Sequence, residues 1–165
     1  MLAAVEVIGN RDPQRWVRAA QDYNARYGTL FETLGYFEVV RRRYREADSW
    51  YARAIGVQPD LWSAQRERGL NLMRLGDKDG ARAHLTRAYG GDPYSTATVN
   101  TLRLLDSLDQ FEVIESAPPA LRLQLHRTEA AALSPYVQQL SREAIASFSS
   151  RYGWTPTTPL TVEMY

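Results

Sequence analysis

Apolar residues in the first 108 positions fall at helical spacing, and the segments that carry them are separated by short turns rich in glycine, proline and aspartate. Asp12-Pro13 has the form of a helix start, because aspartate caps a first turn and proline suits the first helical position. Gly90-Gly91-Asp92-Pro93 has the form of a helix stop. The pattern predicts helices over about 12–28, 29–41, 44–57, 61–75, 78–89 and 94–108, after a shorter one at Met1–Ile8.

Two windows of this helical region repeat each other at a spacing of about 34 residues. Small residues recur where two helix backbones must approach, and prolines recur where a helix must stop. The matched pairs are Gly35 and Gly69, Ala47 and Ala81, Ala54 and Ala88, and Pro59 and Pro93. A partial repeat precedes them, because Trp16 and Trp50 show the same spacing. The spacing predicts a solenoid of helix-turn-helix units, with full repeats over about 28–61 and 62–95.

The pattern changes after Leu108. Apolar and polar residues alternate over about 111–113 and 121–126, which is typical of half-buried strands, and Pro118-Pro119 between them should prevent one continuous strand. A helix is then predicted to end near Tyr152, with its start either at Thr128 or at Ser134-Pro135, and a last strand is predicted over about 160–164.

These elements together predict a mainly α protein. An α-α superhelix should occupy residues 1–108, with partial repeats on either side of the two full ones. A small α+β segment should occupy residues 109–165. Two or three short strands and one helix make a poor separate domain, because a small sheet leaves a face and its edges unsatisfied. This segment therefore either packs on the solenoid or is a truncated domain.

Composition excludes several classes of partner. The 165 residues include 20 basic and 19 acidic ones, so the net charge of +1 creates no field that would recruit nucleic acid or an anionic membrane. No apolar run approaches the roughly 18 residues that a transmembrane helix needs. The first residues lack the basic start of a signal peptide and include Glu6. The compartment stays unknown, because the absence of cysteine does not decide it.

No residue pattern predicts catalysis, a metal or a cofactor. His84 and His126 are the only histidines, they lie in different segments, and neither belongs to the H-E-x-x-H motif of zinc peptidases. Gly90-Gly91-Asp92 is too short for a phosphate-binding loop, and no serine stands in a G-x-S-x-G motif. The basic run Arg41-Arg42-Arg43 surrounds a helix turn and is followed by acidic residues, which favours a solvated helix end over a nucleic-acid site.

Residues 28–61 and 62–95 resemble tetratricopeptide repeats. The first window matches that family's pattern at Phe31, Leu34, Gly35, Tyr44, Ala47, Tyr51, Ala54 and Pro59, and the second at Gly69, Leu72, Gly76, Ala81, Leu85, Ala88 and Pro93. Arg68 departs from the pattern, which prefers leucine there. The alternative is another array of helical hairpins without this geometry. The resemblance implies a non-catalytic protein-interaction or scaffold module.

In tetratricopeptide arrays the first helix of each pair lines the concave face that binds a protein or peptide. The candidate binding residues are therefore Glu32, Tyr36, Val39 and Val40, then Arg66, Leu70 and Met73, then Asn100, Thr101 and Leu104. The family's clamp for acidic chaperone tails has no counterpart, because its positions hold Glu32, Tyr36, Glu67, Ala97 and Thr101. We expect no binding of acidic tails. The face is predicted to take a partner protein or peptide, or to be filled by the C-terminal helix of the same chain.

The last 65 or so residues resemble a junction in bacterial proteins that join tetratricopeptide repeats to a gluzincin-like metallopeptidase domain. The likeness is carried by residues 100–106, 121–123, 129–137 and 151–163. It implies a fragment of a larger peptidase whose zinc motif lies beyond Tyr165, so this chain itself is not expected to be an enzyme. One alternative is a complete small adaptor whose C-terminal segment caps the solenoid. The other is an enzyme with an unrecognised site.

Overall fold

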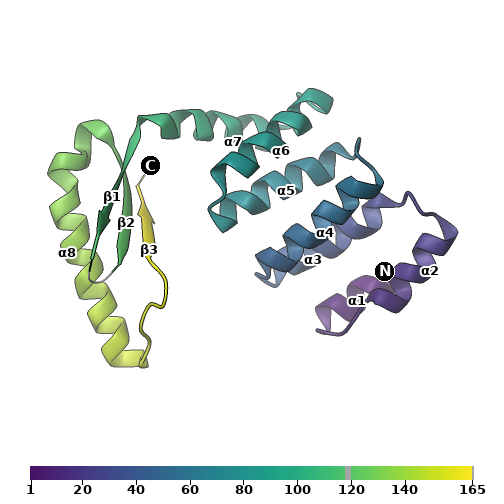
Figure 1. Cartoon of the computed structure of the whole chain (residues 1–165), viewed down its shortest axis with the longest axis horizontal. Helices are drawn as coiled ribbons and strands as arrows, with labels where there is room; N and C mark the ends of the chain where they lie inside the picture. Colours follow the sequence, from purple (N-terminus) through teal and green to yellow (C-terminus); the bar gives the residue numbers. More distant parts are fainter. Residues whose placement is uncertain (118–119, 165) are drawn as a thin grey trace. The chain divides into compact units, whose positions relative to one another are not determined.

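The computed structural model describes residues 1–117 and 120–164. The chain divides into two compact units, Met1–Leu105 and Asp106–Tyr165. The first unit is helical, and the second combines a small sheet with one long helix (Figure 1). The predicted fold class, mainly α with paired helices followed by a small α+β segment, is confirmed.

The first unit is built of helices, most of which form hairpins. They are α1 (Leu2–Ile8), α2 (Gln14–Tyr23), α3 (Gly28–Val40), α4 (Tyr44–Val57), α5 (Trp62–Leu75), α6 (Lys78–Gly91) and α7 (Thr96–Ser107), which a short 3-10 turn, η1 (Leu108–Gln110), follows. Helix α3 packs along α4 and α5 along α6, while α4 also packs on α5 and α1 on both α2 and α3. Each hairpin therefore contacts the next one through its neighbouring helices.

Glycine at one repeat position lets the two helices of a hairpin approach closely. A Cβ atom on Gly35 would lie 2.7 Å from Cε1 of Tyr51, and one on Gly69 would lie 2.6 Å from Cγ of Leu85. Tyr51 and Leu85 are completely buried, so these contacts are at the centre of each hairpin. The repeated glycines are thus explained by packing against a large side chain on the second helix.

Two turns depend on local polar contacts. Helix α5 ends at Gly76, which adopts the left-handed conformation at φ 81°. The next residue, Asp77, caps α6 by accepting a hydrogen bond from the Gly80 amide at 2.9 Å. Helix α2 ends at Tyr23 rather than near residue 28 as predicted, because Asn24 is extended and its side chain accepts a bond from the Arg26 amide at 3.0 Å.

The basic turn between α3 and α4 is only partly solvated: Arg42 is exposed, as the sequence predicted for a helix end, but Arg41 and Arg43 are half-buried and bonded. Arg43 forms a two-bond ion pair with the buried Glu38, at 2.6 and 2.8 Å. Arg43 also donates to the side chain of Asn10, and Arg41 donates to the Val7 carbonyl. These arginines connect the α3–α4 turn to the end of α1, so they hold two successive hairpins together.

The second unit contains β1 (Phe111–Ser116), β2 (Leu121–His126), α8 (Arg127–Tyr152) and β3 (Leu160–Glu163). Strand β2 lies in the middle of the sheet, antiparallel to β1 and parallel to β3. Helix α8 covers one face (Figure 1). The small core comprises Ile114, Leu123, Leu125, Ala130, Leu133, Val137 and Val162. The prediction that Pro118-Pro119 interrupts a strand lies outside the described residues.

Helix α8 begins directly after β2. Its cap is His126, whose Nδ1 accepts from the Thr128 amide at 3.4 Å and lies 2.8 Å from the Thr128 hydroxyl. Of the two predicted starts, Thr128 is correct within one residue and Ser134-Pro135 is wrong. Pro135 lies inside the helix, where its ring lacks the amide that would bond to the Ala131 carbonyl. The proline is exposed, so the lost bond does not leave a deeply buried group.

Candidate protein-interaction surface

The candidate residues on α3 and α5 form one surface, because these helices contact each other directly. We call it the first-helix face: Glu32, Tyr36, Val39 and Val40 on α3, with Arg66, Leu70 and Met73 on α5. Tyr36 and Val40 expose 54% and 60% of their surface, and the other five are half-buried. The face therefore presents apolar side chains to solvent between flanking charged ones.

Charged groups of α3 and α5 act on the buried hydroxyl of Tyr51. Burial raises the pKa of Tyr51, the negative charge of Glu67 raises it further, and Arg74 acts in the opposite direction. Glu32 and Tyr36 on α3 also raise it, by smaller amounts. Groups from both α3 and α5 therefore act on one buried hydroxyl contributed by α4.

Arg66 on the face and Arg74 next to it differ in their partners. Arg66 pairs with Glu67 at 3.1 Å, and the guanidinium of Arg74 lies 5.9 Å from the ring centre of Tyr44. Within residues 1–117 and 120–164, no cation lies within ion-pair distance of Glu32. The ring of Tyr44 does not neutralise Arg74, so among the described residues Glu32 and Arg74 are the charged groups here without an ion-pair partner, one at each end of the face. The free carboxylate of Glu32 does not suit an acidic ligand group at its end.

The candidate residues on α7 are separate from this arrangement. Asn100 is exposed, Thr101 and Leu104 are half-buried, and the Thr101 hydroxyl donates to the Ala97 carbonyl at 2.7 Å. In the part of the chain that the structure describes, α7 is not among the helices with extensive contacts to another element. The structure therefore brings together seven of the ten candidates and leaves these three on a more loosely packed helix.

Two exposed residues of α1 escaped the sequence interpretation. Leu2 and Val5 expose 54% and 46% of their surface on a helix that packs against α3. They stand one repeat length before Tyr36 and Val39. The signal that could have found them is the repeat spacing itself, extended backwards by one unit. The predicted binding residues start at Glu32, so the short helix at Met1–Ile8 is not among them.

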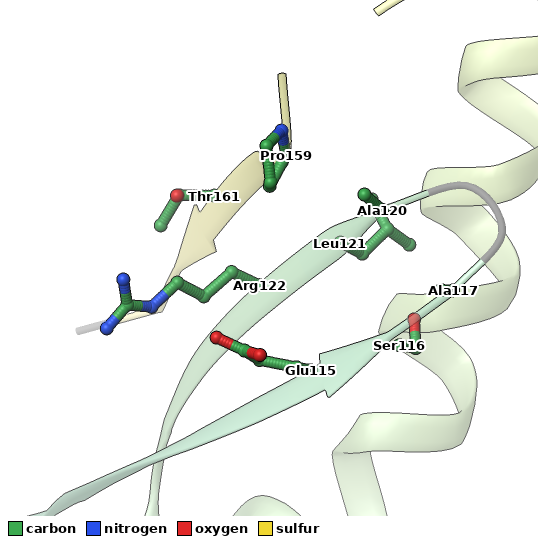
Figure 2. Close-up of a pocket in the computed structure, with 8 residues that line it drawn as sticks. All are labelled: Glu115, Ser116, Ala117, Ala120, Leu121, Arg122, Pro159 and Thr161. Carbon is green, nitrogen blue, oxygen red and sulfur yellow. The ribbon is translucent and has the colours of Figure 1, made fainter. Parts of the chain in front are cut away.

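A hollow of about 480 Å³ lies at the end of the sheet in the second unit. Figure 2 shows that β1, β2 and the chain entering β3 line it, with Arg122 near Glu115 across the two strands. The Ser116 hydroxyl has no hydrogen-bond partner among the described residues. Among the same residues no base lies within hydrogen-bond distance of that hydroxyl.

Helix α8 carries a row of exposed large apolar residues spaced by four or eight positions. The row comprises Tyr136, Leu140, Phe148 and Tyr152, and the last two stack with ring centres 5.9 Å apart. The sheet core ends on α8 at Val137, which leaves the second half of the helix without buried residues. This row is a second apolar surface, on the second unit.

Both histidines contact uncharged polar side chains. The ring of His84 lies 2.7 Å from the Gln65 side-chain oxygen, and that of His126 contacts Gln110 and Thr128. Over residues 1–117 and 120–164, no three metal-binding side chains come together. The same residues contain no helix of sufficient length and apolar character to cross a membrane.

No protein family and no curated protein matches this sequence. The fold, however, is similar to a solved structure, the first tetratricopeptide repeat domain of Spaghetti (RPAP3), which is bound to an HSP90 peptide, SRMEEVD. The match has a TM-score of 0.50 and 17% identity, and covers 55% of this chain and 71% of the other. The likeness identifies the class of fold, an array of helical hairpins of the tetratricopeptide type. At this identity it does not transfer a ligand.

Proposed function

We propose that this protein is a non-catalytic interaction module that binds a segment of another protein on its first-helix face. The observation that carries the proposal is the exposure of Tyr36 and Val40 beside Leu70 and Met73 on directly packed helices. Large apolar side chains exposed together are typical of interaction sites. Residues Asn100, Thr101 and Leu104 on α7 would extend the site when a ligand reaches them.

Selection from a random peptide library on the full chain tests this proposal. Selected peptides should bind the unchanged protein and should bind Val40→Glu at least tenfold more weakly. The matched control is Val113→Glu, which changes a valine of similar exposure (45%) on the sheet of the second unit. Peptides that bind Val40→Glu as tightly as the unchanged protein would place their site elsewhere and contradict the proposal.

The ligand is proposed to differ in charge from the acidic HSP90 peptide that is bound in the similar structure. Arg66 is paired with Glu67, and Glu32 adds unpaired negative charge. The peptide SRMEEVD should therefore show no measurable binding in a calorimetric titration. Micromolar binding that disappears in Arg66→Glu would overturn this part of the proposal.

A finer proposal rests on the sequence resemblance alone: the chain is part of a larger protein with a zinc metallopeptidase domain. The alternative is a complete adaptor in which the second unit caps the helical array. Sequencing the reading frame decides between them. An H-E-x-x-H motif downstream of residue 165 supports the peptidase, and a stop codon directly after it supports the adaptor.

A further inference from the structure

Apolar residues that are exposed or half-buried continue from α3 and α5 onto α1 in the register of the repeat. One row contains Leu2, Tyr36 and Leu70, and a second contains Val5, Val39 and Met73, with one repeat length between successive members. Helix α1 contacts α3, and α3 contacts α5, so both rows run across three successive helices. Together the six side chains make a strip, which we call the two-row strip.

The shape of this strip distinguishes between two kinds of bound peptide. The rows lie three residues apart on each helix, which is about one helical turn, or roughly 5 Å. Packed helices are about 8–10 Å apart, close to the roughly 11 Å of two turns of a helix laid across them. The apolar stripe of an amphipathic helix is two residues wide, so it fits both the spacing between the two rows and the spacing between neighbouring helices. An extended strand presents a single line of side chains on one face.

Charge determines what should flank that stripe. Glu32 lies on the same helix as Tyr36, one turn before it, and makes no ion pair within residues 1–117 and 120–164. Arg66, one turn before Leu70, is partnered by Glu67, whereas Arg74, one turn after Leu70, contacts only the ring of Tyr44 and keeps its charge at the opposite edge of the strip. A basic residue beside the apolar stripe of the ligand would therefore meet an unpaired carboxylate.

We infer that the two-row strip, including Leu2 and Val5 of α1, is the docking surface for a basic amphipathic helix of a partner protein. This inference rests on the proposed function and specifies the ligand and the extent of its site. It adds α1 to the first-helix face and assigns the unpaired charge of Glu32 a role in choosing the partner.

The test uses a synthetic peptide of roughly 15 residues, long enough to be partly helical alone. It carries leucines at positions i, i+3, i+4 and i+7 and lysines beside them. A second peptide has glutamates in place of the lysines. Titrations with the full chain should give micromolar binding of the lysine peptide and at least tenfold weaker binding of the glutamate peptide. Equal binding of both peptides contradicts the inference that the ligand is basic. No binding of the lysine peptide contradicts the inference that the ligand is a basic amphipathic helix.

The variants Leu2→Glu and Val5→Glu test the contribution of α1. Each should weaken binding of the lysine peptide at least fivefold. The matched control is Ile8→Glu, because Ile8 is equally exposed (50%) on the same helix but lies outside both rows. All three positions are exposed, and equal urea midpoints would establish that the variants remain folded.

The outcomes separate this inference from the proposed function. Binding that is lost in Val40→Glu but unchanged in Leu2→Glu and Val5→Glu retains the proposed function and rejects the role of α1. Library peptides that bind at Val40 but are acidic reject the inferred ligand alone. Library peptides whose binding is unaffected by every one of these substitutions reject both.

Discussion

Replacing Gly35 by alanine should destabilise the helical unit, although alanine is the better helix former. In a helix interior this change gains about 1 kcal/mol from backbone entropy. The new methyl group, however, would lie 2.7, 2.8 and 2.9 Å from three ring atoms of Tyr51. Ordinary contacts between carbon atoms are about 3.5–4.0 Å, so the ring would have to move by nearly 1 Å.

The ring cannot move easily, because Tyr51 is completely buried. Overpacking a core costs about 1–3 kcal/mol, and a fixed aromatic ring favours the upper part of that range. The net loss should be about 1–2 kcal/mol. With an m-value of about 2 kcal/mol per molar urea, the midpoint falls by about 0.5–1 M.

Gly56→Ala is the matched control. Gly56 lies in α4, is exposed, and a Cβ there would contact nothing within 4 Å. Only the entropy gain remains, so this variant should be more stable by about 0.5–1 kcal/mol. Replacement by alanine should therefore lower the free energy of unfolding at Gly35 and raise it at Gly56.

Tryptophan fluorescence can follow the helical unit separately. Trp16, Trp50 and Trp62 lie in the first unit, and Trp154→Phe removes the fluorophore of the second.

The penalty at Gly35 should disappear when Tyr51 is also replaced by alanine. The close-approach explanation is refuted by a Gly35→Ala midpoint equal to or above that of the unchanged protein. It is equally refuted by a penalty that persists without the ring.

Three further outcomes are expected. Glu38→Gln should lower the free energy of unfolding by about 1–3 kcal/mol, because it weakens charged hydrogen bonds from Arg43 at a buried site; an unchanged urea midpoint would contradict this. Asp77→Ala should cost about 1 kcal/mol and Asp77→Ser much less, because serine also caps helices; equal losses in thermal melts would argue against the cap. Burial first, and then the charges of Arg68 and Arg87, lower the pKa of His84 below its ordinary 6.5. Because the folded protein favours neutral His84, this residue's contribution to the free energy of unfolding is complete above pH 6.5 and is lost as pH falls through that value toward the folded-state pKa. NMR titration of the ring should give a midpoint below 6.5, and His84→Gln should flatten the dependence of stability on pH.

The helical hairpins could be predicted from sequence because their signals are local. Gly35 and Gly69 recur at one position since a backbone must pass a large side chain, and the turns contain residues with strong conformational preferences. The start of α8 was less certain, because proline predicts a helix boundary and Pro135 nevertheless lies inside. A histidine cap after a strand has no established sequence signature.

Contacts between hairpins were not predictable in the same way. Arg41 and Arg43 form a basic run in the sequence, yet their partners Val7 and Asn10 lie 34 and 33 residues earlier in the chain. The candidate face was inferred from the position of each residue within the repeat. The structure adds which of its charges are paired, as Arg66 is by Glu67, because ion pairs depend on rotamers that a repeat pattern does not encode.

The arginine contacts also mean that the hairpins are not interchangeable units. Deleting residues 28–61 would keep the repeat spacing and bring the turn after α5 to the end of α1. At that turn the positions of Arg41 and Arg43 are occupied by Leu75 and Asp77, which cannot donate side-chain hydrogen bonds to Val7 and Asn10 as the guanidinium groups do. The array repeats in its backbone, but each junction has its own side-chain bonds. A shortened array would therefore lose the side-chain bonds that join its first two hairpins.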